Sequence, residues 1–275
     1  MRGLGGCGMG LNRLRSYDYL RRMKAIRILA ALCILSWGAP EASSQTRSVR
    51  DSALTSPHLH LSLGTTSTYG VLADRMGYGG LVGLGFHVKQ RSNVYWGLSA
   101  HWGFGHRLVE QGVLSNLLTP AGELIDNEGQ VAYVGITGRS GLFTADVGWL
   151  WSDWGPNPNS GILLLAGLGS FHHRLHFENT ENRITQLEQP QLALYDRLCW
   201  GVAGRISISY FHMSNDGLRN FHVNLFWMHA NTWSQRPFHA DLQLVEEGLR
   251  QEGVLGLTLG WAFHLYKRAP KEHWY

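Results

Sequence analysis

The chain has 275 residues, a formal net charge of +4, only 16% charged residues, 34 glycines and 11 tryptophans. Low charge with abundant Gly and Trp is unusual for a soluble enzyme of this length. It is typical of a small transmembrane barrel, in which Gly fits a narrow lumen and aromatic side chains lie at the two membrane interfaces. No basic patch interleaved with aromatic residues indicates nucleic-acid binding, so we expect no nucleic-acid partner. We also expect no cofactor.

The N-terminal region has the features of an exported protein. Residues 1–22 fit no structural element and are interpreted as an upstream extension before a start at Met23. A basic start, an apolar stretch over 28–37 and the small residues Ala42 and Ser44 predict a signal peptide over 23–44. The apolar stretch is too short to cross a bilayer as a helix.

The mature chain is expected to form one domain. Residues 45–56 are interpreted as a polar linker, 57–266 as the barrel and 267–275 as a periplasmic tail. Cys199 is the single cysteine that remains after cleavage, which excludes an intramolecular disulfide.

Alternation with a period of two predicts eight half-buried strands. One face typically carries Leu, Val, Phe or Trp, and the other carries Gly, Ser, Thr or His, but the strand over 161–176 is apolar with less clear facing. In chain order the strands are 58–70, 78–89, 94–106, 141–152, 161–176, 197–211, 220–231 and a closing strand that ends at Leu265. Residues 130–137 also alternate, so either they pair within a loop and extend the barrel, or the barrel has ten strands.

The connections alternate in length in the way expected of an outer-membrane barrel. If the first strand runs outward from the periplasm, short turns lie inside and long loops lie outside. Both termini are then periplasmic, and the fold class is all-β, an antiparallel transmembrane β-barrel. The predicted short turns are 90–93, 153–160 and 213–219, and the long loops are 107–140, 177–196 and 232–252.

The closing strand has the form of the C-terminal signal by which outer-membrane barrels are recognised for insertion. Its signal residues are Thr258, Gly260, Phe263 and Leu265. The pattern implies contact with the barrel-assembly machinery and with outer-membrane lipid. The alternative is an edge strand of a soluble sandwich.

Large aromatic side chains are expected at two levels of the barrel, as membrane girdles. The predicted periplasmic girdle is Trp96, Trp149, Trp151, Trp261 and Phe263, and the predicted outer girdle is Trp102, Phe104, Trp200 and Trp227.

Two polar groups are candidates for a role inside the barrel. Asp146 and Arg205 both fall on lumen faces and are expected to pair, because a buried charge needs a partner. The pair would stabilise a packed interior, and the alternative is a polar relay. His172, His173 and His176 are close in sequence, but neighbouring residues on a strand point to opposite faces, so no metal site is predicted.

An enzymatic alternative rests on His212-Met-Ser214-Asn, which resembles the His-x-Ser-Asn motif of outer-membrane lipid A deacylases. The resemblance implies His212 and Ser214 as catalytic residues of a lipid hydrolase. The predicted topology places the motif in a periplasmic turn, whereas that chemistry acts on the outer leaflet. The next strand also offers no acid to orient the His. We therefore expect a protein that is not an enzyme.

Several segments resemble a largely uncharacterised family of small outer-membrane barrels in Bacteroidota, with an OmpX/OmpA-like architecture. They are Gly155-Pro-Asn-Pro-Asn-Ser-Gly-Ile162, Tyr195-Asp-Arg-Leu198, Ser214-Asn-Asp-Gly-Leu-Arg-Asn-Phe221 and Tyr266-Lys-Arg-Ala-Pro-Lys-Glu272. Small barrels of this phylum include accessory subunits of secretion and assembly machines. The resemblance implies such an accessory role, with an envelope protein as partner; a passive channel is the least favoured alternative.

The tail after the closing strand is predicted to dock that partner. Its basic and aromatic residues are of the kinds that most often stabilise interfaces. Anchoring to the membrane surface is the alternative. The docking residues are Lys267, Arg268, Lys271, Trp274 and Tyr275.

Overall fold

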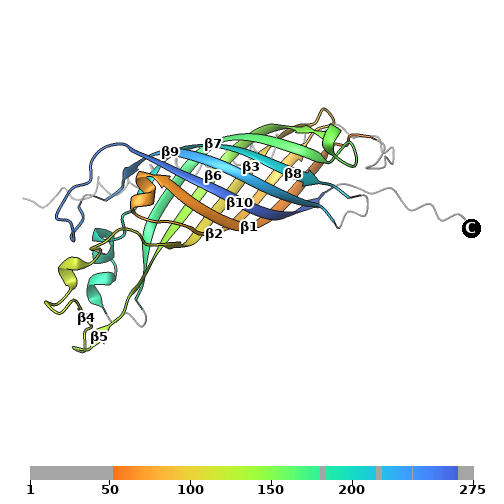
Figure 1. Ribbon diagram of the computed structural model, residues 1–275. Coiled ribbons are helices and arrows are strands. Elements are labelled where there is room, and N and C mark those ends of the chain that lie inside the picture. Colours follow the sequence, from red (N-terminus) through yellow and green to blue (C-terminus); the bar gives the residue numbers. More distant parts are fainter. Residues whose placement is uncertain (1–51, 180–183, 215–218, 237, 266–275) are drawn as a thin grey trace, which may run out of the picture. The chain divides into compact units, whose positions relative to one another are not determined.

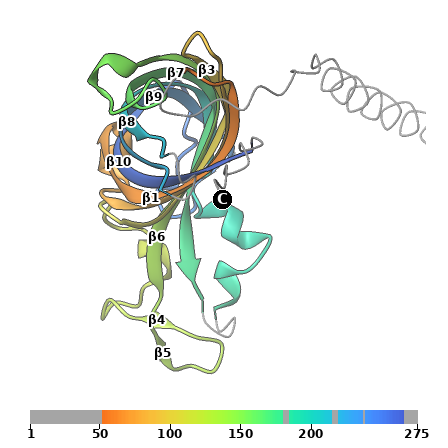
Figure 2. The same cartoon turned by 90° about the vertical axis from the view of Figure 1, so that its right-hand side faces the viewer.

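The computed structural model describes residues 52–179, 184–214, 219–236 and 238–265. Within them, eight antiparallel strands close into a barrel in the order β1-β10-β9-β8-β7-β6-β3-β2 (Figures 1 and 2). Their bounds are β1 Ser56–Gly70, β2 Gly79–Lys89, β3 Val94–Arg107, β6 Gly135–Trp151, β7 Gly161–Glu178, β8 Cys199–His212, β9 Phe221–Ser234 and β10 Arg250–His264. The predicted eight-stranded fold is confirmed. The predicted leader, signal peptide and tail lie outside the described residues.

The strand-like segment 130–137 is divided between two elements. β5 (Val131–Ala132) pairs with β4 (Leu124–Ile125) in a small separate sheet. From Gly135 onward the chain belongs to β6, which pairs with β7 as far as Glu178. The segment therefore extends one hairpin of the barrel and adds no spanning strand, which decides between eight and ten.

The outer face of the barrel is apolar on every strand. The period-two pattern places one set of side chains outside, where Leu63 is 61% exposed and Leu168 71% exposed. All nine predicted girdle residues point outward. Trp227 lies at the midpoint of β9 and stacks on Tyr69 near the end of β1, at a centroid distance of 6.4 Å. The described residues contain no helix with the length and hydropathy needed to cross a bilayer.

The two ends of the barrel differ, as the lengths of the connections predict. We call one end the turn end, where residues 90–93, 152–160 and 213–220 connect the strands. The other is the loop end, with connections 71–78, 108–134, 179–198 and 235–249.

A hydrophobic cluster joins the connections of the loop end to the barrel. Leu72, Leu114, Ile184 and Leu187 come from three connections and are almost completely buried. They belong to the same cluster as Leu175 and other wall residues that face inward. Short 3₁₀ helices, η1 (Val71–Asp74), η2 (Ser115–Leu117), η5 (Thr185–Leu187) and η6 (Gln191–Leu194), give these connections local structure. The described parts of these connections thus form a folded cap, a name that we use below.

Candidate functional sites in the lumen and beneath the cap

The structure brings Asp146 and Arg205 together inside the barrel. Asp146 of β6 lies opposite Gly167 of β7, and Gly167 lies opposite Arg205 of β8. A Cβ atom on Gly167 would lie 2.1 Å from Asp146 Oδ1, so the two charged side chains meet over a position that has no side chain. Arg205 Nη2 lies 2.8 Å from Asp146 Oδ2.

Neighbouring polar groups contact this ion pair, although Asp146 Oδ1 and Arg205 Nε have no hydrogen-bond partner among the described residues. Ser99 Oγ donates a hydrogen bond to Asp146 Oδ2 at 2.6 Å, and His87 Nε2 lies 3.2 Å from the same oxygen. Arg205 Nη1 lies 3.2 Å from His101 Nε2. The side chains of Asp146 and Arg205 are 0% and 3% exposed, so each charge depends on its partners in place of water.

The lumen around the pair is filled. A cavity of about 40 Å³ lies among lumen residues that include His58, His60 and His222. This volume holds no more than a few water molecules. An eight-stranded barrel normally has an interior that side chains fill, and this geometry supports a packed core in place of a pore.

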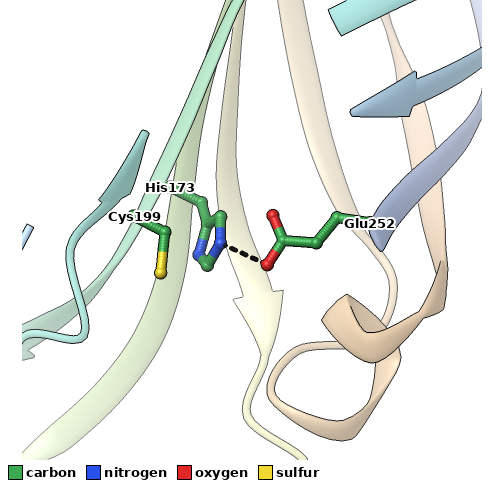
Figure 3. A group of neighbouring side chains, drawn as sticks. All are labelled: His173, Cys199 and Glu252. Carbon is green, nitrogen blue, oxygen red and sulfur yellow. Dashed lines mark hydrogen bonds and ion pairs between the residues drawn. The ribbon is translucent and has the colours of Figure 1, made fainter. Parts of the chain in front are cut away.

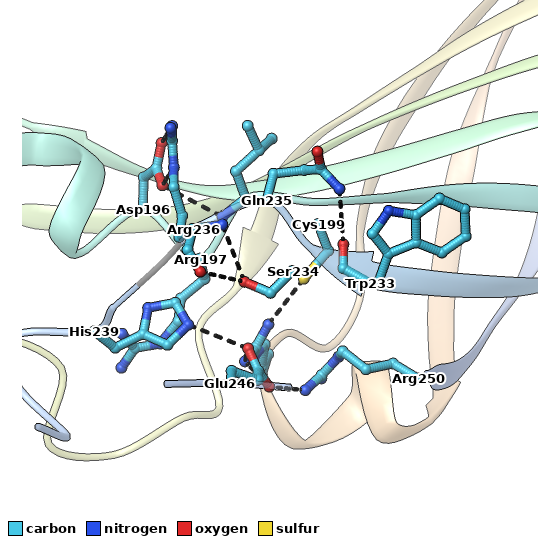
Figure 4. Close-up of polar contacts among 12 residues, drawn as sticks. Asp196, Arg197, Cys199, Trp233, Ser234, Gln235, Arg236, His239, Glu246 and Arg250 are labelled. Carbon is cyan, nitrogen blue, oxygen red and sulfur yellow. Dashed lines mark hydrogen bonds and ion pairs between the residues drawn. The ribbon is translucent and has the colours of Figure 1, made fainter. Parts of the chain in front are cut away.

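Two groups of charges hold the cap together, and Figure 4 shows the one around Glu246. Arg197, two residues before β8, is buried and donates hydrogen bonds to Glu110 at 2.9 and 3.0 Å and to Asp241 at 2.5 and 2.8 Å. The three residues come from three different connections of the loop end. Burial disfavours the charged guanidinium, but the hydrogen bonds that it donates to Asp241 and Glu110 outweigh this effect and raise the pKa of Arg197.

Glu246 is the centre of a further group of ion pairs. Arg75 Nη2 lies 2.6 Å from both oxygens of its carboxylate, Arg250 forms another ion pair with it, and His239 Nε2 lies 3.2 Å away. Burial opposes ionisation of the carboxyl, but hydrogen bonds from His239 and Arg75 outweigh it and hold the pKa of Glu246 well below its ordinary value. The 71–78 and 235–249 connections are therefore linked to β10.

Beneath this network lies a buried cluster of His173, Cys199 and Glu252 (Figure 3). His173 of β7 is directly opposite Cys199, the first residue of β8. Glu252 reaches them from β10, and its Oε1 lies 2.9 Å from His173 Nε2. Arg75 Nη1 lies 3.4 Å from Cys199 Sγ, and Arg250 Nε donates to Glu252 Oε1 at 3.0 Å.

Sequence analysis missed this cluster because it compared His173 with its neighbours in the chain. His172 lies on the opposite face of β7 and stacks on Phe143 at 6.4 Å, in agreement with the expected alternation. The sequence does indicate that His173, Cys199 and Glu252 all face inward, because each occupies an inward position in the alternation of its strand, which we call its parity. Parity alone does not show which residues of different strands lie at the same level.

The residues of the alternative hydrolase lie at the turn end. The His212 ring contacts the Phe221 ring at 5.0 Å, and the Ser214 backbone N–H donates to Asn220 Oδ1 at 2.9 Å. Among the described residues, no carboxylate forms an ion pair with His212; residues 215–218 of the motif are outside the described residues.

The predicted insertion-signal residues are divided between the two faces of β10 and its end. Thr258 and Gly260 face the lumen, whereas Phe263 and Leu265 point outward. The predicted docking residues Lys267, Arg268, Lys271, Trp274 and Tyr275 lie outside the described residues.

The geometry defines a class: a closed eight-stranded barrel with an apolar outer face, a filled polar lumen and a cap at one end. No protein-family model matches the sequence, and no curated protein sequence matches it. The resemblance to a Bacteroidota family therefore stays a hypothesis.

Solved structures that the chain resembles are small barrels of Gram-negative bacteria. Ail, the attachment invasion locus protein of Yersinia pestis, aligns over 76% of this chain and 99% of its own with 10% identity and a TM-score of 0.39. Neisserial surface protein A covers 75% and 96% with 8% identity and a TM-score of 0.40. The N-terminal barrel domain of Pseudomonas aeruginosa OprF covers 76% and 100% with 10% identity and a TM-score of 0.36. Similarities this distant transfer neither residues nor activity to this chain.

Proposed function

We propose that the protein is an integral outer-membrane β-barrel that acts as a structural or accessory subunit of an envelope secretion or assembly complex. The observation that carries the membrane location is the apolar outer face of a closed barrel. Closure pairs the backbone groups of all eight strands, as a lipid environment requires. Soluble monomers rarely expose an apolar patch larger than a few hundred Å². Here every strand of the ring exposes large apolar side chains.

The interior supports an anchoring role over a channel. The Asp146–Arg205 pair lies within the lumen, and the cap joins the connections above it. The cap also presents apolar side chains to solvent, among them Tyr133, which is 93% exposed, and Leu244 and Leu249. Exposed apolar and aromatic residues on a folded, charge-paired scaffold suit contact with another envelope protein.

Fractionation tests the membrane location. The protein should fractionate with outer membranes and migrate differently in gels with and without heating, as folded barrels do. Recovery in the soluble periplasm would reject the proposal. In planar bilayers, the purified protein should give no stable conductance steps, and steady channel currents would favour the alternative.

A native pull-down from outer membranes tests the accessory role. The full chain should retain a stoichiometric envelope partner, and deletion of 267–275 should release it while the barrel stays heat-modifiable. Unchanged co-purification would reject docking by the tail. The Ser214→Ala variant distinguishes this proposal from the lipid hydrolase. We expect the same lipid A acylation with the unmodified chain and with the variant, whereas a hydrolase would lose its activity.

A further inference from the structure

We propose that His173, Cys199 and Glu252 form a binding site for a divalent transition-metal ion of the zinc class, buried between the barrel wall and the cap. Imidazole nitrogen, thiolate sulfur and carboxylate oxygen are the donor types that bind zinc in proteins. One ligand atom from each residue lies within 4.8 Å of those of the other two. Tetrahedral zinc needs separations of about 3.3 Å between N and O and about 3.6 Å to S. Side-chain shifts of about 1 Å would therefore complete the triangle.

The strands hold these side chains in place. His173 and Cys199 are directly opposite each other in the β7–β8 ladder. Glu252 lies opposite Ala230 of β9, and Ala230 lies opposite Ala203 of β8. These small buried residues leave space over which the longer Glu252 side chain reaches His173. A site on paired strands is more precise than one on loops, because the ladder limits backbone movement.

The charges around the cluster are compatible with a dication. Arg75 and Arg250 lie close to the ligands, and both form ion pairs with Glu246; Arg250 also forms an ion pair with the ligand Glu252. The Arg75 guanidinium can donate a hydrogen bond to Cys199 Sγ. With a Cys199 thiolate and the Glu252 carboxylate as ligands, a dication makes the centre neutral, which burial favours.

The same three residue types also occur as nucleophile, base and orienting acid in hydrolases. Burial argues against that role here. His173, Cys199 and Glu252 are all 0% exposed, so a substrate has no access to the thiol. A metal ion can enter while the chain folds or the cap opens, and it would then join β7, β8 and β10 beneath the cap.

Metal binding by the full chain, purified from membranes in mild detergent, tests this proposal. After treatment with a chelator and dialysis against Zn²⁺, one tightly bound zinc per chain is expected by elemental analysis. Co²⁺ should give the charge-transfer absorption of a cobalt–thiolate bond. Cys199→Ser should abolish that absorption, and Glu252→Gln should weaken zinc binding at least tenfold. His172→Gln is the matched control, since His172 is the next residue on the same strand but faces outward, and it should bind as the unmodified chain does.

Heat-modifiability of each variant shows whether the barrel is folded, so lost binding is separated from lost structure. If Cys199→Ser does not fold, the cobalt spectrum and zinc content of the unmodified chain still decide. A folded unmodified chain that binds no zinc would overturn the proposal. So would equal zinc content and cobalt absorption in folded Cys199→Ser and His172→Gln.

Discussion

Replacing Asp146 with Ala should destabilise the barrel strongly. The substitution removes the carboxylate that Arg205, Ser99 and His87 contact. Arg205 would then be a buried cation with 3% of its side chain exposed and with Ser99 and His101 as its remaining polar neighbours among the described residues. The cost therefore comes mainly from an unpaired buried cation.

The size of the effect follows from this geometry. Removing one partner of a buried ion pair costs about 3–5 kcal/mol. That corresponds to a change of roughly a hundredfold to several thousandfold in the folding equilibrium constant. The double variant Asp146→Ala/Arg205→Met removes both charges and keeps an apolar side chain of similar length. It should cost less than Asp146→Ala alone, because no unpaired charge remains.

Urea unfolding in detergent micelles, followed by tryptophan fluorescence, measures these differences. Asp146→Ala, Arg205→Met and the double variant complete a double-mutant cycle, which isolates the coupling between the two residues. The reasoning is refuted if Asp146→Ala costs less than about 1 kcal/mol, the value expected of an exposed pair. It is equally refuted if the costs of the single substitutions simply add.

Three further predictions concern the wall and the cap. Gly167→Ala should destabilise the barrel by about 1–3 kcal/mol in the same urea assay, because the new Cβ would lie 2.1 Å from Asp146 Oδ1. Gly204→Ala is the control and should be tolerated, because a Cβ at Gly204 has one neighbouring atom, at 3.8 Å. Leu63→Arg, at the middle of β1, should cost about 2–4 kcal/mol in lipid, and Leu63→Val far less; equal costs would argue against a lipid-facing position. The depressed pKa of Glu246 contributes stability that is present above its ordinary value of 4.5 and is lost as pH falls through the lower folded value. Acidification below that value should speed hydrogen exchange in 235–249, after correction for intrinsic rates, and unchanged protection would contradict the role of this carboxylate.

The strands were predictable because alternation is a local property. Each wall residue faces either the lipid side or the lumen, so apolar residues alternate along a strand with small or polar ones. The exception was 130–137, whose alternation is real but is divided at Gly135 between the β4–β5 sheet and the start of β6. Alternation within a segment does not show where the chain stops pairing with one strand and begins to pair with another.

The site residues also differ in how far their contacts could be predicted from the sequence. That Asp146 and Arg205 both point inward follows from parity, and their pairing follows from the cost of burying a lone charge. To predict the neighbours of Cys199, one must know the register of the β7–β8 ladder and the path of the Glu252 side chain across β9. Arg75 and Glu246, which surround that cluster, belong to connections whose paths depend on the folded cap.

The ion pairs themselves argue that the lumen does not transmit solutes. A path through the barrel would have to separate Asp146 from Arg205, at about 3–5 kcal/mol if neither finds a new partner. It would also have to open the cap, where Arg197 is bonded to Glu110 and Asp241. The first step alone limits an open state to roughly one molecule in a hundred or fewer. These contacts therefore support the anchoring role proposed above over a channel.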